Sequence, residues 1–380
     1  MSPGTRPGLA DSPPGNDGRR LPSGLSVIRS RAEFARLRRA WNECLATMPG
    51  AHLFLTHEWL AAWLEHQGRG AELFVPVVAD GGAILAAAPL VRRRGRYYGL
   101  PVEEIVLIGN HTSDRVQFLV QPDHEDLCET LWRAILAECG QWRIVRLEQV
   151  PATAPTVTRR PVRGCRVGCE PTSSLPFIDI AGSWEDFEKS LAPKFRSKLR
   201  NKEKTFAHWG DWTLRVVRGC ETIDHLDQLV AVELDSAKAA GGYAFFASAT
   251  NVEFARALLR SSPPLDPLLC ELVIGDEVVA YTLGFIHGGV YFGYNMAYRR
   301  GYEAGNCGKW LIHQTFKYAF EHGLRGLDLL RGASDVKRNW RPRLEQNCRL
   351  VVFPRNPLFL PHKLAVFHVR PALKSLVKGR

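Results

Sequence analysis

The sequence lacks several features that would place the protein in a membrane, outside the cell or among metalloenzymes. It has no apolar run of about 18 residues, the length that a membrane-spanning helix requires. The charged start of the chain is followed by no apolar segment, so we predict no signal peptide. Nine scattered cysteines and twelve histidines show no C-x-x-C, H-x-E or H-E-x-x-H spacing. The expectation is a cytoplasmic protein with reduced thiols and no metal.

The composition indicates a folded basic protein. The chain has 380 residues, of which 45% are hydrophobic, enough for two or three domains with cores of their own. Its formal net charge is +11, from 50 Lys and Arg against 39 Asp and Glu. This excess favours an anionic partner, such as nucleotide phosphates, nucleic acid or an anionic membrane surface. A basic surface without any such partner explains the same excess equally well.

The order of the predicted elements suggests a duplicated unit. Strand, Gly/Asp turn and strand occur at 73–91 and again at 269–286, and helix, glycine and strand occur at 127–147 and at 309–330. We therefore predict an α/β (α+β) protein with two similar units, each with a mixed, mainly antiparallel sheet flanked by helices. The expected division is a disordered tail (1–23), a first unit (24–150), a linker (151–170), a second unit (171–355) and a basic tail (356–380).

One stretch of the second unit, 289–332, suggests an anion site. A strand at 289–298 leads through a glycine-bearing loop into a helix at 309–322, and a second strand follows at 326–330. A glycine-rich turn that opens a helix presents unpaired N–H groups at the positive end of the helix dipole. The residues predicted to hold phosphate are Arg299, Arg300, Gly301, Gly305, Asn306, Cys307, Gly308 and Lys309. An ordinary βαβ turn with surface charge explains this stretch equally well.

Two further features bear on where an anion would bind. The equivalent helix of the first unit is entered through 121–126, where three acids would repel a phosphate. A phosphorylated ligand is thus expected in the second unit. The predicted helix that starts at Pro193 carries six Lys or Arg residues within 194–204 against one acid. This helix could hold phosphates, bind RNA or simply be solvated.

The joint order of these motifs resembles the GNAT acetyltransferase superfamily, and more closely its tandem branch with FemAB-like and CelD-like proteins. Asp328, Gly332, Lys337 and Trp340 match the Asp-bearing strand, the glycine and the Lys-x-x-Trp element of that branch. The basic helix and the pattern Phe-x-x-x-x-Trp-Leu at 54–60 match as well. Val336 replaces the usual tyrosine, and the usual Ser-Pro before the glycine of the loop is missing.

The resemblance implies an acyl-CoA donor whose pyrophosphate lies on the loop before the helix at 309–322. It also implies a backbone oxyanion donor near Asn295, Met296 and Ala297. Candidate catalytic residues are Glu233 and Asp328 as bases, Tyr298 as proton donor and Lys337 as an anion-binding group. For each of these four, a structural role or a solvated position is the competing interpretation. Candidate contacts to the acceptor are Lys194, Arg200, Asp335 and Trp340.

The resulting hypothesis is an N-acyltransferase, with acetyl-CoA or another acyl-CoA as co-substrate and a small-molecule amine or an envelope or polysaccharide precursor as acceptor. One alternative is a FemAB-like aminoacyltransferase that uses aminoacyl-tRNA, which the positive charge would suit. Another is a non-catalytic protein that binds a polysaccharide-synthesis assembly or a membrane surface through its basic tail. DNA is not an expected partner.

Overall fold

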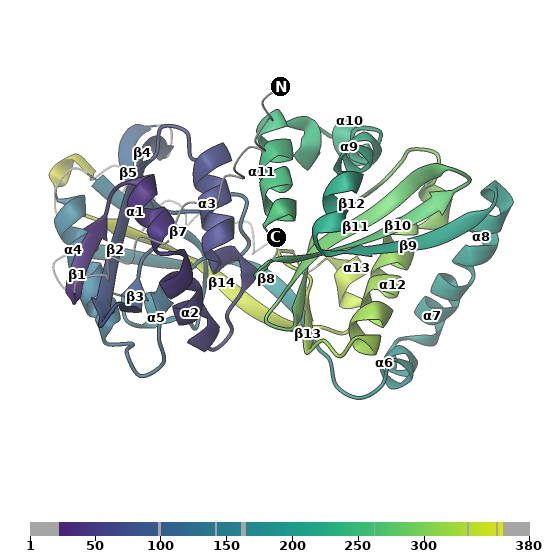
Figure 1. Cartoon of the computed structure of the whole chain (residues 1–380), viewed down its shortest axis with the longest axis horizontal. Helices are drawn as coiled ribbons and strands as arrows, with labels where there is room; N and C mark the ends of the chain where they lie inside the picture. Colours follow the sequence, from purple (N-terminus) through teal and green to yellow (C-terminus); the bar gives the residue numbers. More distant parts are fainter. Residues whose placement is uncertain are drawn as a thin grey trace, which may run out of the picture.

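The structure, a computed structural model, has two lobes joined by one continuous sheet (Figure 1). It describes residues 23–359 except 98–99, 141–142, 161–164, 262, 333 and 355. Most of the two predicted tails therefore lies outside the described residues. No helix in the described part of the chain is long and apolar enough to cross a membrane.

The first lobe is built from the first half of the chain. Its elements are β1 (Gly24–Ile28), α1 (Arg31–Arg36), α2 (Arg38–Thr47), η1 (Leu53–Leu55), α3 (His57–His66), β2 (Glu72–Asp80), β3 (Ala83–Ala87), β4 (Leu90–Tyr97), β5 (Leu100–Leu107), β6 (Leu119–Val120), α4 (Leu127–Cys139), β7 (Arg143–Pro151) and α5 (Pro155–Thr158).

The second lobe follows the same plan. Its elements are β8 (Arg166–Asp179), α6 (Trp184–Ser190), α7 (Pro193–Arg200), α8 (Lys202–Trp209), β9 (Trp212–Arg218), η2 (Gly219–His225), α9 (Leu226–Leu234), α10 (Ala237–Ala240), η3 (Phe245–Ala247), α11 (Ala249–Arg260), β10 (Asp266–Ile274), β11 (Glu277–His287), β12 (Val290–Tyr298), η4 (Glu303–Gly305), α12 (Cys307–Glu321), β13 (Gly326–Asp328), α13 (Asp335–Arg338), β14 (Arg343–Phe353) and η5 (Pro357–Phe359).

Capping residues and a proline that can be read from the sequence mark the starts of several helices. The Thr56 side chain accepts a hydrogen bond from the Trp59 N–H and caps α3. Ser183 caps α6 in the same way through the Asp186 N–H. Pro193 stands in the first turn of α7, where its missing N–H costs nothing.

Three predicted segments are wrong in detail. The basic helix is not continuous, because it breaks at Asn201 into α7 and α8. The arginine-rich stretch 92–98 is typical of a basic loop, but Arg92 and Arg93 belong to β4 and pair with carboxylates of neighbouring elements. Part of the predicted linker is ordered, with α5 inside it and 166–170 forming the start of β8.

The strand order of the sheet reflects the two units. Its strand order is β6-β3-β2-β4-β5-β7-β14-β8-β13-β12-β11-β10-β9, and β1 pairs with β2. Two neighbouring pairs are parallel, β5 with β7 and β12 with β13, and each is connected through a helix, α4 or α12. All other pairings among the described strands are antiparallel. The predicted fold class, two mainly antiparallel units in tandem, is confirmed.

The two lobes share their core. Trp59 of α3 is fully buried and makes edge-to-face contacts with Phe254, Phe285 and Tyr294 of the second lobe. Strand β14, from the end of the chain, lies between β7 of the first lobe and β8 of the second (Figure 1). This shared packing fixes the second lobe's central strands, where the candidate site lies.

Candidate active site

The site begins where β12 and β13 separate. The two strands pair only over Val290–Phe292 and Gly326–Asp328. Strand β12 continues to Tyr298, but no other described strand pairs with it on that edge. The register of β12 against β11 shifts between Leu283 and Gly284, which marks a β-bulge. The open edge of β12 and the following helix α12 therefore form the two sides of a gap in the sheet.

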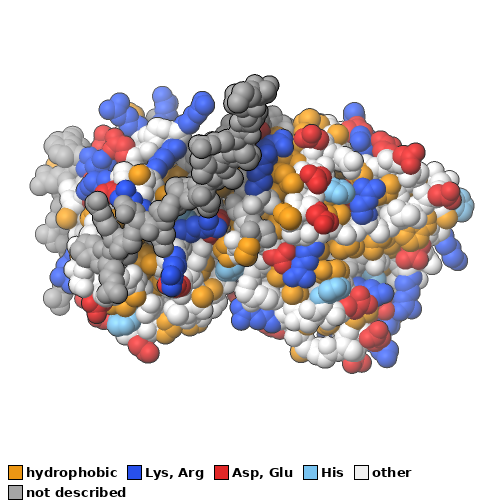
Figure 2. Space-filling model, viewed as in Figure 1, with side chains coloured by type: hydrophobic (Ala, Val, Ile, Leu, Met, Phe, Trp, Pro, Cys, Tyr) orange, Lys and Arg blue, Asp and Glu red, His pale blue; other side chains and the backbone are white. Residues whose placement is uncertain are grey.

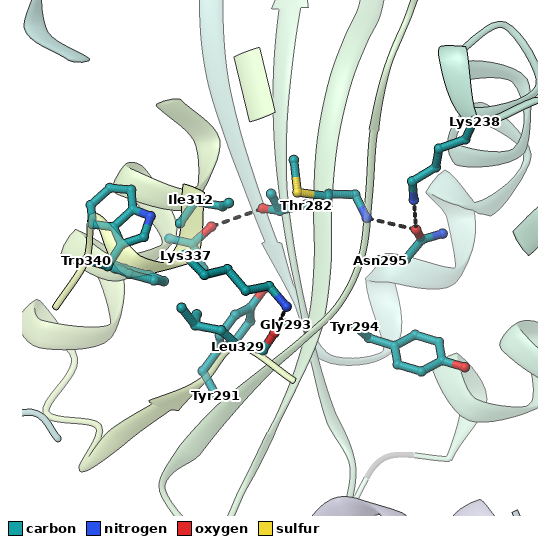
Figure 3. A pocket seen from close by; sticks show the side chains of 13 residues that line it. Lys238, Thr282, Tyr291, Gly293, Tyr294, Asn295, Ile312, Leu329, Lys337 and Trp340 are labelled. Atoms are coloured by element: carbon teal, nitrogen blue, oxygen red, sulfur yellow. Dashed lines mark hydrogen bonds between the residues drawn. The ribbon is translucent and has the colours of Figure 1, made fainter. Parts of the chain in front are cut away.

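A largely apolar cavity of about 200 Å³ fills this gap (Figure 3). Ile312 and Phe316 of α12 line it, together with Leu329 and Trp340. The indole of Trp340 is fully buried, and its Nε1 has no hydrogen-bond partner in the described structure. A buried donor without a partner is unfavourable, so a ligand acceptor in this cavity would be stabilised there.

A second, basic cavity of about 450 Å³ lies beside the start of the same helix. Four lysines line it, Lys194 and Lys198 of α7, Lys202 of α8 and Lys309 of α12. Lys202 donates to the Ala304 carbonyl at 2.8 Å. No ion pair among the described residues neutralises the other three. In Figure 2, basic side chains are visible on the lobe edge where Figure 1 places α7.

The two cavities follow each other along α12. Lys309 lines the basic one, and Ile312 and Phe316, one and two turns further on, line the apolar one. Asn339 lines the basic cavity, and Trp340, the next residue in the sequence, lines the apolar one. The site thus offers uncompensated positive charge at one end and an apolar space at the other.

The glycine loop itself differs from the predicted phosphate cradle. The amides of Gly305, Asn306 and Lys309 donate to carbonyls within the loop, those of Tyr302, Glu303 and Asn306. Those three N–H groups are therefore not available, and the expectation for them is wrong. No backbone carbonyl of a described residue accepts from the Cys307 or Gly308 N–H at the helix start.

Two of the loop glycines, Gly305 and Gly308, allow close packing. A Cβ at Gly305 would lie 2.6 Å from the Trp209 ring, and one at Gly308 would lie 2.1 Å from Met296 Cε. Cys307 is fully buried, and this burial raises the pKa of its thiol to about 12. Gly301 is exposed with φ of +90°, so it permits the turn after β12.

Several charged residues predicted to bind ligands are paired with acids instead. Arg299 contacts Asp235 and Glu277, and Arg300 contacts Asp235. Arg200 pairs with Glu188 at 2.7 Å and does not line the basic cavity. None of these three arginines lines the apolar or the basic cavity. Asp335, in the first turn of α13, is exposed and lines neither cavity.

Glu233 is neither on a solvated face nor free to act as a base. It is fully buried on α9, and its two oxygens accept from the Phe246 N–H at 2.9 Å and from Lys238 Nζ at 3.1 Å. Tyr281 lies nearby, and its pKa is raised by burial and then by the charge of Glu233. The carboxylate therefore holds neighbouring groups in place.

Asp328 connects the two lobes. Its Oδ2 lies 2.6 Å from Arg115 Nη2 of the first lobe, and its Oδ1 accepts from the Leu330 N–H at 2.9 Å. Burial raises the pKa of this carboxyl to about 6, although Arg115 opposes the shift. It does not line the apolar cavity, so it is not placed to take a proton from a ligand there.

Lys337 and Tyr298 also have structural surroundings. Lys337 lines the apolar cavity, but its Nζ donates to the carbonyls of Leu329 and Arg331, both at 2.6 Å, and of Leu330 at 3.4 Å. Burial lowers the pKa of this amine. Tyr298 is half-buried and packs in the cluster around Trp310, outside the cavity.

A residue that the sequence does not single out, Lys238 of α10, faces the apolar cavity (Figure 3). Its Nζ donates to Asn295 Oδ1 at 2.7 Å, and the Met296 N–H donates to the same oxygen at 2.8 Å. Asn295 Nδ2 donates in turn to the Tyr281 hydroxyl at 3.0 Å. A lone lysine in a short helix carries no motif, so pattern reasoning could not have found it.

A third cavity, of about 760 Å³, lies between the lobes and is lined by polar residues. Arg115, which pairs with Asp328 and Glu345, is one of them. His52 and Asn347 also line it and are almost fully buried. Neither ring nitrogen of His52 has a partner in the described structure, and burial lowers the pKa of its imidazole.

Comparison with known proteins places this site in a recognised domain. Residues 193–338, from α7 to α13, match the family described as "Acetyltransferase (GNAT) domain". A search of curated protein sequences finds no match. Among solved structures, FemX is similar at 12% identity over 88% of this chain and 98% of that chain, with a TM-score of 0.61.

A second similar structure is the C-terminal DUF2156 domain of a candidate lysylphosphatidylglycerol synthetase from Agrobacterium fabrum. It shares 15% identity over 89% of this chain and 96% of that chain, with a TM-score of 0.54. At these identities the likeness concerns the fold. It extends over nearly the whole of both chains, so the duplicated architecture is shared and not the second lobe alone.

Proposed function

We propose, from the match of residues 193–338 to the acetyltransferase (GNAT) domain family, that the chain is an N-acyltransferase that uses acetyl-CoA or another acyl-CoA. The acceptor would be an amine of a small molecule or of an envelope or polysaccharide precursor. The observation that carries the proposal is the pair of adjoining cavities along α12, one basic and one apolar.

The basic cavity suits the phosphates of an acyl-CoA, and the apolar cavity suits its acyl end. Lys194, Lys198 and Lys309 have no acidic partner among the described residues, and clustered ammonium groups attract phosphates. The apolar cavity next to them suits the acyl end, because burying apolar surface contributes about 25 cal/mol per Å². The unpartnered Trp340 Nε1 would donate to an amide carbonyl of the pantetheine arm.

The chemistry is an acyl transfer from a thioester to an amine. The open edge of β12 offers the Met296 N–H at the wall of the apolar cavity, where a thioester carbonyl would need a donor. The buried walls formed by Phe316, Leu329 and Trp340 would keep water from competing with the amine.

A FemAB-like aminoacyltransferase is the second candidate. The observation that favours it is the similarity of the fold to FemX over 88% of the chain. The lysines of α7 would then contact the nucleic acid backbone, and binding would weaken steeply with salt.

Calorimetry with a single-charge substitution separates these proposals. Lys309→Met should weaken acetyl-CoA binding roughly ten-fold, because a hydrogen bond to a charged group contributes about 1.5 kcal/mol or more. Lys317→Met is the matched control, since Lys317 lies on the same helix but pairs with Glu321 and lines neither cavity. The control should change affinity less than about two-fold.

Two outcomes would refute the acyl-CoA proposal. One is the absence of acetyl-CoA binding by the full chain. The other is equal affinity of the wild type and of Lys309→Met. Salt-sensitive binding of bulk tRNA, with no competition from CoA, would instead support the second candidate.

A further inference from the structure

Two hydrogen-bond donors converge on one oxygen at the wall of the apolar cavity. The oxygen is Asn295 Oδ1, and the donors are Lys238 Nζ at 2.7 Å and the Met296 N–H at 2.8 Å (Figure 3). All three residues line the cavity. Asn295 is almost fully buried, at 9% exposure, so water does not compete freely for these donors.

The ammonium of Lys238 is held in position by a buried carboxylate. Glu233 accepts from it at 3.1 Å and is itself fixed by the Phe246 N–H at 2.9 Å. Glu233 is fully buried, whereas the Lys238 side chain is 30% exposed. The charge is thus anchored on one side and reaches the cavity on the other.

The Met296 N–H is placed by the irregularity of β12. The β-bulge lies immediately before Asn295, where the pairing with β11 passes from Gly293 to Asn295. Beyond Phe292 the other edge of β12 has no strand partner in the described part of the chain. The Met296 N–H bonds a side-chain oxygen at this open edge.

A backbone N–H and an ammonium aimed at one oxygen are the donor set that stabilises a developing oxyanion. The Asn295 side-chain amide oxygen therefore stands in for a carbonyl oxygen of a ligand. We propose that Lys238, with the Met296 N–H, binds the thioester carbonyl oxygen of the acyl donor, and that Asn295 occupies this position only until the donor binds. This inference rests on the proposed acyl-CoA function.

The transfer step assigns a role to each group. The amine nitrogen of the acceptor forms a bond to the carbonyl carbon, and the carbonyl π pair moves onto the oxygen between Lys238 and the Met296 N–H. When that pair returns, the C–S bond breaks and the sulfur leaves with its electrons. The proton lost by the nitrogen ends on this thiolate. Lys238 gives up no proton, and Glu233 acts as a positioning residue.

The test uses the carbonyl stretch of acetyl-CoA labelled with ¹³C at the carbonyl carbon, measured by infrared difference spectroscopy on the full chain. In the wild type the band should move to lower frequency on binding, because two donors polarise the bond. In Lys238→Met the band should return most of the way to its value in solution. A lysine that only tied α10 to β12 would leave the bound band unchanged.

Kinetics supply a second readout that needs no identified acceptor. Slow hydrolysis of acetyl-CoA, followed as CoA release by chromatography, should have a kcat about 100-fold lower in Lys238→Met. The dissociation constant of acetyl-CoA should stay within about three-fold. Lys317→Met removes one positive charge outside both cavities and should behave as the wild type in both measurements.

Asn295→Ala tests the placeholder independently, and it keeps the proposal open to refutation if Lys238→Met does not fold. Removing the internal acceptor should leave the polarised band in place and bind acetyl-CoA at least as tightly as the wild type. A loss of the band shift, or a fall of kcat like that of Lys238→Met, would overturn the role given to Asn295. Unchanged bands in Lys238→Met would overturn the role of Lys238 but not the acyl-CoA proposal, which the binding measurements on the wild type and Lys309→Met test separately.

Discussion

At the scale of single residues, the ionisable groups around the split strands mostly satisfy one another. Glu233 is committed to Lys238 and the Phe246 N–H, and Lys337 is committed to three backbone carbonyls. No carboxylate or imidazole of a described residue lines the apolar cavity. The charged side chains that line it, Lys238 and Lys337, are both cationic, which suits the stabilisation of negative charge.

Asp328 should make the stability of the fold depend on pH. Its pKa is raised from 3.8 to about 6, chiefly by burial, so the native state binds this proton more tightly than the unfolded chain does. Stability from this group is present at low pH and is lost as pH rises from about 4 to about 6. The free energy of unfolding of the wild type relative to Asp328→Asn should fall by roughly 2–3 kcal/mol between pH 4 and pH 7.

Urea denaturation at several pH values measures this difference. Asp227→Asn is the control, because it also removes one carboxylate, from a side chain that is 90% exposed. A difference between the wild type and Asp328→Asn that stays flat, or that rises with pH, would contradict the burial-dominated pKa.

At the scale of elements, the bulge between β11 and β12 determines where the Met296 N–H of the site lies. Gly284 stands opposite Gly293 at the register shift. A Cβ at Gly284 would lie 2.5 Å from the Phe292 carbonyl oxygen and 2.4 Å from the Tyr291 ring, whereas a Cβ at Gly293 would meet the Tyr291 ring at an ordinary 3.4 Å. The two glycines therefore have different reasons to be small, although the sequence around them gives no sign of it.

The prediction is that Gly284→Ala destabilises the protein and Gly293→Ala does not. The backbone oxygen near Gly284 cannot move without displacing β12, so the cost should be about 1–3 kcal/mol. Gly293→Ala, on the facing strand, should change the free energy of unfolding by less than about 0.5 kcal/mol. Equal effects of the two substitutions in chemical denaturation would show that the close approach at Gly284 is relieved without strain.

At the scale of the whole molecule, the two lobes form one folded body. Buried apolar residues of both lobes belong to a single cluster, and β14 completes the sheet between β7 and β8. Ion pairs of Arg331 with Asp114 and of Arg115 with Asp328 cross the same boundary. The third cavity lies at this junction, and Arg115 is one of its lining residues. Its shape therefore depends on both lobes.

Trp59→Ala should therefore weaken both lobes together. The indole is fully buried between the lobes, and its removal should cost roughly 3–5 kcal/mol. A single unfolding transition, shifted equally by circular dichroism and by tryptophan fluorescence, is the expected result. Trp184→Ala is a control of similar size, because Trp184 packs within the second lobe on Phe187 and Phe320. Two transitions in Trp59→Ala, one at the wild-type midpoint, would contradict a shared core.

The sequence alone determined the parts that depend on local pattern. The repeated order of strands and helices predicts the tandem fold, Thr56 and Ser183 predict helix starts, and the lysines of α7 predict a basic element. These features follow from periodicity, capping and composition. All three depend on residues that are close together in the sequence.

Only the tertiary structure decided which charges remain available. Arg299 and Arg300 look like phosphate ligands in the sequence, but both pair with Asp235, more than sixty positions earlier. Lys238 carries no motif and yet reaches Asn295, 57 positions away. Whether a charged group faces a ligand or a partner depends on contacts between distant segments, because a buried charge is stable only with a counter-charge or hydrogen bonds close by.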